Sequence, residues 1–244
     1  MSFIDHSGVS IISGGQTGVD LAGLRAAQCL GFRTGGWAPL GFKTTAGPKP
    51  QLKKLFKLQE HSGGYISRTR KNVDVSSVTL IVAADFESAG TKLTIELCKE
   101  LGIPYKTVQL HLNPPEASNM MLRYKVPDAS IQREILDWLD KESKNGLNEY
   151  GLFAINIAGN SSLSAPGIFP TAFLFFTSLF GRFYIEGSKA LNIPVDENLI
   201  NLSKKMFSPN VAYALADSYD YYKDLDPRSG THLLIDSTST TIPD

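Results

Sequence analysis

Short apolar runs alternate with longer amphipathic stretches along this chain. The runs at 9–12, 78–84 and 152–158 are apolar almost throughout, which is typical of strands covered on both faces. Two further short strands are expected at 32–34 and 105–112. Apolar residues recur at helical spacing in the segments between them. The pattern predicts helices at 19–30, 92–101, 128–143 and 166–182, and a loop-rich region at 40–66 with a short helix near 51–58.

Strands separated by whole helices predict a parallel sheet with right-handed crossovers. We therefore expect an α/β fold with a doubly wound, Rossmann-like parallel sheet. Residues 1–184 would form the ligand-binding domain. Residues 185–244 would form a C-terminal extension, with a helical part inside 189–206 and a flexible polar tail that includes Asp236–Thr241. The extension shows no catalytic pattern, so a cap or an oligomer contact is its simplest role.

Composition narrows the classes of function. The 244 residues carry a formal net charge of zero, so nothing in the overall charge favours nucleic acid as a partner. The most apolar stretch, 169–183, contains Pro170 and Arg182 and predicts a buried helix rather than a membrane span. Cys29 and Cys98 form no CxxC pair and are expected to be buried thiols. The N-terminus does not look like a signal peptide, so we expect a cytoplasmic protein.

A glycine-rich loop at 13–18 joins the first strand to the first helix. It has neither the Lys of a P-loop nor the G-x-G-x-x-G order of a dinucleotide site. Even so, small residues and the unpaired amides of a helix N-terminus together favour an anion, most often phosphate. The alternative is a tight turn whose glycines serve packing alone. The candidate ligand-binding residues here are Gly14, Gly15, Gln16, Thr17, Gly18 and Asp20.

Two other loops follow strands and should meet the first at the carboxyl edge of the sheet. They span 85–91 and 158–166, and they contribute Gly90, Thr91 and Asn160 as candidates. Thr91 could cap the following helix or bind a phosphate oxygen. We expect the three loops to converge on one site.

Cationic and aromatic residues near these loops supply further candidates. Arg68, with Thr69 and Asn72, lies in a basic stretch that could clamp an anion or simply face solvent. Trp37, after Gly36, could stack on a flat heterocycle or anchor the core. The four histidines show no metal-binding spacing, and no metal ligands or catalytic residues are predicted.

Six motifs in the same order resemble the molybdenum (molybdopterin) cofactor carrier family. The resemblance covers about residues 9–182 and implies a Rossmann-like fold related to the cytokinin-activating phosphoribohydrolases, a lysine decarboxylase-like superfamily. It also implies a homo-oligomer whose ligand is a molybdopterin-type cofactor, a nucleotide or a related anion. Ser77, Ala89 and the length beyond 184 depart from the family pattern. The motifs are 13–20, 35–39, Arg68-Thr69 with Asn72, 79–81, 90–94, and 156–159 with 166–168.

The related phosphoribohydrolases suggest an alternative, the release of free base from a nucleoside 5′-monophosphate. Their pattern places Glu shortly after the Gly-Thr pair, where it can assist attack at the sugar carbon. Here Leu93 and Thr94 occupy those positions, and Glu96 is out of phase. A binding or carrier protein for a phosphate- or oxyanion-bearing small molecule is therefore the first hypothesis. A structural or interaction module that uses 186–244 is a third.

Overall fold

The computed structural model describes residues 8–114, 122–148, 151–192, 194–206 and 212. The N-terminal residues and the polar segment Asp236–Thr241 discussed above lie outside this part of the chain. Five parallel strands form the central sheet in the order β2-β1-β9-β7-β8. Their bounds are β1 Val9–Ile12, β2 Arg33–Gly35, β7 Val78–Ala83, β8 Tyr105–Gln109 and β9 Phe153–Gly159. The predicted α/β fold class is confirmed.

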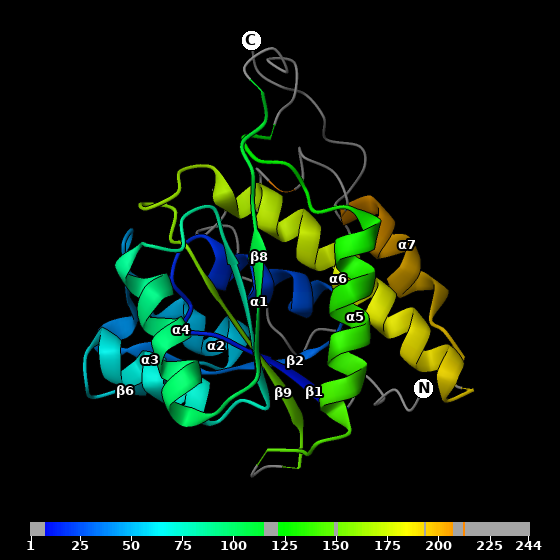
Figure 1. The fold of residues 1–244 in the computed structure, drawn as a ribbon, viewed down its shortest axis with the longest axis horizontal. Helices are drawn as coiled ribbons and strands as arrows, with labels where there is room; N and C mark the ends of the chain where they lie inside the picture. The colour runs from blue at the N-terminus through cyan, green and yellow to red at the C-terminus, as the bar shows by residue number, and fades with distance from the viewer. Residues whose placement is uncertain (1–7, 115–121, 149–150, 193, 207–211, 213–244) are drawn as a thin grey trace.

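Helices cover both faces of the sheet (Figure 1). One face packs against α1 Val19–Cys29, α5 Ala129–Ser143 and α6 Ile168–Ala190. The other face carries α3 Tyr65–Asp74 and α4 Ala89–Leu101. Right-handed crossovers require this division, because β1-α1-β2 and β7-α4-β8 run toward opposite edges of the sheet. The sheet is therefore doubly wound.

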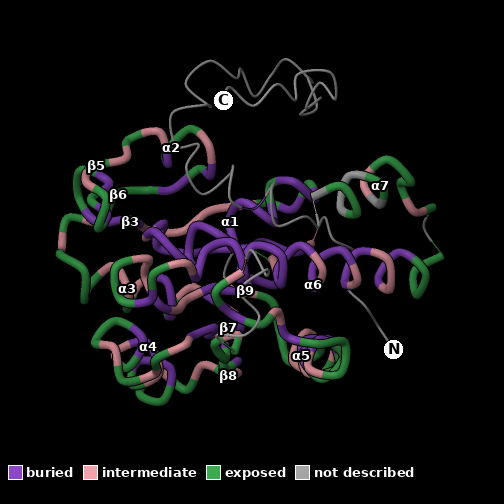
Figure 2. The backbone as a smooth tube through the Cα atoms, turned by 90° about the horizontal axis from the view of Figure 1, so that it is seen from above, coloured by how far each residue is buried: buried purple, intermediate pink, exposed green. Residues whose placement is uncertain are grey.

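The two faces have different chemistry. On the α1, α5 and α6 face, strands β1, β7 and β9 present Ile11, Leu80 and Ile155 to the large apolar core. On the α3 and α4 face, β7 and β9 present the polar residues Thr79 and Asn156, which are nonetheless buried. Figure 2 shows burial concentrated along α1, β9 and α6, with exposed residues on the outer sides of α4, α5 and α7. The cysteines are buried, as expected, and burial raises the pKa of Cys29 to about 11.

Small elements lie between β2 and β7, where the sequence indicated mainly loops. Strand β3 Trp37–Pro39 pairs in parallel with β6 Gln59–His61, and β4 Lys43–Thr44 pairs with β5 Gly47–Pro48. A 3-10 helix, Leu40–Phe42, and α2 Gln51–Phe56 complete the region. Helix α3 was not expected from the sequence. It begins after Gly64 with no side-chain cap, and Asn72 and Val73 are its buried residues, so the chain shows neither a cap signal nor a wide apolar stripe.

Helix α6 is longer than expected. It begins at Ile168 and continues without a break to Ala190, so it crosses position 184, where the C-terminal extension was expected to begin. Helix α7 Glu197–Met206 then packs against α6. Within the described residues, α6 is the one helix long and apolar enough to cross a membrane, yet 83% of its most apolar window is buried inside the protein. Such burial is typical of a core helix.

Gly36 sets the path of the chain from β2 into β3. Its φ of +118° disfavours any other residue, and an added Cβ would lie 2.3 Å from the Ser13 carbonyl oxygen. Gly31 also has a positive φ, +73°, but an added Cβ there would meet nothing within 4 Å. A comparison of substitutions at the two glycines therefore distinguishes the cost of backbone strain from the cost of a steric clash.

We expect Gly36→Ala to lower the free energy of unfolding by roughly 3 kcal/mol, through strain and a backbone clash together. Gly31→Ala should cost roughly 1 kcal/mol, because strain acts there alone. Urea unfolding of both variants measures the difference. Equal losses at the two positions would show that the close approach of Gly36 to Ser13 carries no energetic weight.

Candidate functional site

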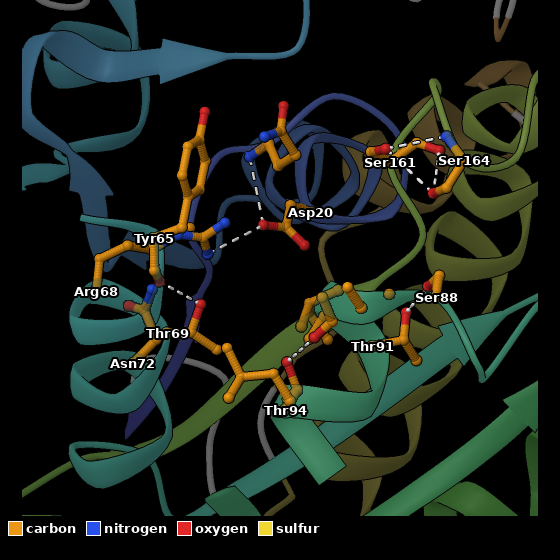
Figure 3. Close-up of a pocket in the computed structure, with 18 of the residues that line it drawn as sticks. Asp20, Tyr65, Arg68, Thr69, Asn72, Ser88, Thr91, Thr94, Ser161 and Ser164 are labelled. Atoms are coloured by element: carbon orange, nitrogen blue, oxygen red, sulfur yellow. Dashed lines mark hydrogen bonds and ion pairs between the residues drawn. The ribbon is translucent and has the colours of Figure 1, made fainter. Parts of the chain in front are cut away.

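A cavity of about 440 Å³ opens at the carboxyl ends of β1, β7 and β9. It lies between α3 on one side and the N-terminus of α4 on the other (Figure 3). The three loops expected to converge, 13–18, 85–91 and 158–166, all contribute to it. This is the position where open α/β sheets bind ligands. Its lining includes the predicted residues Gly14, Gln16, Asp20, Arg68, Thr69, Asn72, Gly90 and Thr91.

The glycine-rich loop does not offer its amides to the cavity as expected. The Gln16 N–H donates to Asp20 Oδ2 at 3.3 Å, and the Thr17 N–H donates to its neighbour's side chain, Gln16 Oε1, at 3.0 Å. The Ser13 N–H donates to a carbonyl of β2, and the Val19 N–H to Asn160 O. The expectation of bare amides is wrong at these four positions, because the chain supplies their acceptors.

The glycines of this loop make room for protein atoms rather than for a ligand. A Cβ at Gly14 would lie 1.6 Å from Arg68 Nη1, and one at Gly18 would lie 2.4 Å from Asn160 O. At Gly15 an added Cβ would lie 2.6 Å from a methyl group of Leu58. Gly15, Thr17 and Gly18 are not among the residues that line the cavity. Close packing explains why positions 14, 15 and 18 of this loop are glycines.

Asp20 is the hydrogen-bond acceptor that the loop holds. Its side chain is 7% exposed, and Arg68 Nη1 lies 3.6 Å from Oδ2. Burial raises the pKa of the Asp20 carboxyl, while Arg68, the Gln16 and Gly14 amides and the Ser13 hydroxyl act in the opposite direction. The Asp20 carboxyl group therefore accepts hydrogen bonds from loop amides of the kind that phosphate-binding loops offer to a ligand.

The raised pKa of Asp20 has a measurable consequence. The folded state holds this proton more tightly than the unfolded chain, so the contribution of Asp20 to stability falls as pH rises from the usual value of 3.8 through the folded-state pKa. We expect the difference in unfolding free energy between the wild type and Asp20→Asn to decrease over that window and then level off.

Asp128 provides a control of opposite sign. The Ser130 hydroxyl and the amides of Ile131 and Ser130 lower the pKa of its carboxyl. Its contribution to stability is therefore present above 3.8 and lost as pH falls through the lowered pKa. Urea unfolding at a series of pH values should give opposite slopes for Asp20→Asn and Asp128→Asn, and equal slopes would contradict the assignment for Asp20.

Arg68 lies on α3, between Asp20 and the ring of Tyr65. Its Cζ is 5.9 Å from the ring centroid, and its side chain is 12% exposed. The contact with Asp20 is too long for a hydrogen bond. The Arg68 Nε is buried and has no hydrogen-bond partner. Within the described residues the guanidinium thus has a charged neighbour but no hydrogen-bond acceptor, which is unusual for a group with five donors.

The N-terminus of α4 faces the same cavity. No side chain of the described residues caps it, and an added Cβ at Gly90 would meet nothing within 4 Å. Thr91 Oγ1 accepts from the Ser88 hydroxyl at 2.9 Å and from Asn160 Nδ2 at 3.1 Å. Both of its lone pairs are then used, which leaves the Thr91 proton as a donor. This end of the cavity therefore presents open helix amides and hydroxyl groups.

Asn160 connects the three loops instead of lining the cavity. Its Oδ1 accepts from the amides of Ala84 and Asp85, and its Nδ2 donates to Asp85 O and to the hydroxyls of Ser88 and Thr91. The residue is 1% exposed. Its carbonyl also accepts the amide of Val19, at the start of α1. Asn160 thereby positions the N-terminus of α4 against the glycine-rich loop.

We expect Asn160→Ala to lower the unfolding free energy by roughly 3 kcal/mol, because it removes several buried hydrogen bonds and leaves their partners unsatisfied. Asn145→Ala is the matched control. Asn145 is exposed and donates only to the carboxylate of Glu142 within its own helix end, so its loss should stay within about 0.5 kcal/mol. Thermal and urea unfolding check both values, and a cost at Asn160 no larger than at Asn145 would exclude its linking role.

The remaining predicted residues also have internal partners. Asn72 pairs with the backbone of Trp37, accepting from its N–H at 2.8 Å and donating to its carbonyl at 2.9 Å. Trp37 packs edge-on against His61. Trp37 and Gly36 do not line the cavity. Gln16 Oε1 also accepts the Thr45 amide at 2.8 Å, which ties the β4–β5 hairpin to the loop.

Several residues that line the cavity were not among the predicted ligand-binding residues. Tyr65 is 46% exposed and presents the aromatic surface that Trp37 was expected to provide. Its position follows from α3, which the sequence did not predict. Thr45 was also not predicted to line the cavity, because it belongs to the β4–β5 hairpin, which the sequence did not predict. The others are Ile66, Ser88, Ala89, Leu93, Thr94, Asn156, Ile157, Ala158, Gly159, Ser161 and Ser164. In the part of the chain that the structure describes, no cluster of acidic, His or Cys side chains could hold a metal.

The fold and the cavity define a Rossmann-like α/β domain with an open cavity at the carboxyl edge of its sheet. The chain belongs to the circularly permutated YpsA SLOG family, whose model matches residues 11–180. A crystal structure named "putative molybdenum carrier protein", from Syntrophus aciditrophicus, is similar to it. That protein is 26% identical, with a TM-score of 0.52, and the match covers 70% of this chain and 93% of that one. None of the curated proteins compared with the chain matches it. The resemblance drawn from the motifs is confirmed.

Proposed function

We propose that this protein binds an anionic small molecule in the cavity and acts as its carrier. The observation that carries the proposal is Arg68, a nearly buried guanidinium without a hydrogen-bond acceptor. Leaving such donors unsatisfied costs free energy, and an acceptor that reaches them from the cavity removes that cost. An oxyanion or phosphate group between Arg68 and the N-terminus of α4 would do so, since both favour negative charge.

The remainder of the cavity suits a flat or polar body attached to the anion. The ring of Tyr65 offers an exposed aromatic surface beside Arg68, and the volume of about 440 Å³ lies in the range of small-molecule sites. A molybdopterin-type cofactor as cargo, or a nucleotide, fits this description. The name of the similar Syntrophus protein supports the first. As before, we expect a cytoplasmic homo-oligomer.

Binding is favoured over hydrolysis of a nucleoside monophosphate. Leu93 and Thr94 line the cavity where the related hydrolases place an acid, and Glu96 is exposed and does not line it. Asp20 is the one acidic residue among those lining the cavity, and its carboxylate is held by the loop and by Arg68. Release of free base from nucleoside monophosphates on long incubation would nevertheless favour the enzyme.

Arg68→Met tests the proposal with inorganic phosphate as the probe. We expect the wild type to bind phosphate and Arg68→Met to weaken binding at least about tenfold, because hydrogen bonds to charged groups contribute roughly 1.5–3 kcal/mol. Gly90→Asp should have a similar effect, because it places a carboxylate in the open space at the start of α4. Isothermal titration calorimetry and phosphorus NMR measure both.

Arg70→Met is the matched control on the same helix. Arg70 pairs with Glu100 on α4 and does not line this cavity, so phosphate affinity should be unchanged. Unaltered affinity in Arg68→Met, or equal losses in the two Arg variants, would contradict the proposed site. Gly15→Asp would not be a clean test, because its side chain would collide with Leu58.

A further inference from the structure

A second buried polar group faces the cavity, and the anion does not explain it. Asn156, on β9, is 2% exposed and is among the residues that line the cavity. Its Nδ2 donates to Thr79 Oγ1 at 3.3 Å. Its Oδ1 receives no hydrogen bond from the described residues. Unlike Arg68 Nε, this oxygen is not fully enclosed by protein atoms, and the residue lines the cavity. Its donor is therefore expected to come from the cavity.

The neighbouring polar residues on this side of the cavity are already satisfied. The Thr69 hydroxyl donates to Tyr65 O at 2.8 Å, and the Thr94 hydroxyl donates to Gly90 O at 3.0 Å. Both the oxygen and the nitrogen of the Asn72 amide are paired with the backbone of β3. Asn156 therefore differs from the polar groups around it, because its carbonyl oxygen is left for a ligand.

The chemistry of this oxygen is opposite to that of Arg68. A carbonyl oxygen accepts hydrogen bonds and carries partial negative charge, so it disfavours the oxygens of an oxyanion. The anion would then lie at Arg68 and α4, and a different part of the ligand would reach Asn156. That part must be a hydrogen-bond donor, and a neutral O–H or N–H group is sufficient to satisfy a neutral acceptor.

Building on the proposed function, we propose that Asn156 is a specificity-determining residue that accepts a hydrogen bond from an uncharged O–H or N–H group of the ligand. The ligand class is then an organic molecule that carries both an oxyanion and a neutral donor. A sugar hydroxyl and a heterocycle N–H are two sources of that donor. A bare inorganic oxyanion would leave Asn156 unsatisfied and bind more weakly.

The test compares three probes: inorganic phosphate, ribose 5-phosphate and guanosine 5′-monophosphate. We expect the wild type to bind at least one of the organic phosphates tenfold or more tightly than inorganic phosphate. Asn156→Leu should weaken binding of that organic phosphate about tenfold, while the affinity for inorganic phosphate stays the same. A loss with ribose 5-phosphate would identify a hydroxyl donor, and a loss confined to the nucleotide would identify a ring N–H.

Ser76→Ala controls for damage to the buried polar layer. Ser76 contacts Thr79 Oγ1 and donates to Val73 O, but it does not line the cavity, so this variant should keep the wild-type preference. The inference is overturned if Asn156→Leu keeps the full preference, if it weakens inorganic phosphate equally, or if the wild type prefers neither organic probe. If the wild type binds none of the three probes, the result contradicts the proposed function itself.

Discussion

The site depends on one carboxylate. Asp20 receives the amide of Gln16 at one side and faces the guanidinium of Arg68 at the other. The glycine-rich loop and the basic helix α3 are far apart in sequence, and this group joins them. Because Asp20 accepts from the loop, fewer of the loop's hydrogen-bond donors remain for a ligand. Donors remain at Arg68 and, on the opposite side of the cavity, at the amides that begin α4.

The topology of the sheet determines where these groups lie. The strand order reverses around β9, so the N-termini of α1 and α4 point to the same edge from opposite faces of the sheet. The amide of Asn160, just past β9, then fixes the loop before α4. The polar pair of Thr79 and Asn156 lies on this face of the sheet, and Asn156 lines the cavity.

The fold could be predicted from the sequence because its signals are local. The apolar runs at 9–12 and 78–84 and the helical spacing at 128–143 all correspond to observed elements. The convergence of three loops followed from topology alone. Side-chain partners could not be predicted in the same way. Nothing local to Gly14 indicates that it accommodates Arg68, and nothing local to Trp37 indicates that Asn72 pairs with its backbone.

Helix α3 is a second example of what could not be predicted from local sequence. Its sequence is mostly polar and uncapped, so its helical form depends on tertiary contacts with α4 and β3. Tyr65 lies on α3 and was therefore not predicted to contribute to the site. Trp37 was chosen as the candidate aromatic residue instead. Functional residues on such segments are found only once the packing is known.

Helix α6 connects the carboxyl edge of the sheet to the last described helix, α7. It runs unbroken from Ile168, just after the loop 158–166, to Ala190; it packs along α1, and α7 packs against it. Because this helix has no break and is mostly buried, the element that begins beside the loop 158–166 also sets where α7 lies. The described C-terminal residues are therefore held in a fixed position relative to the carboxyl edge of the sheet.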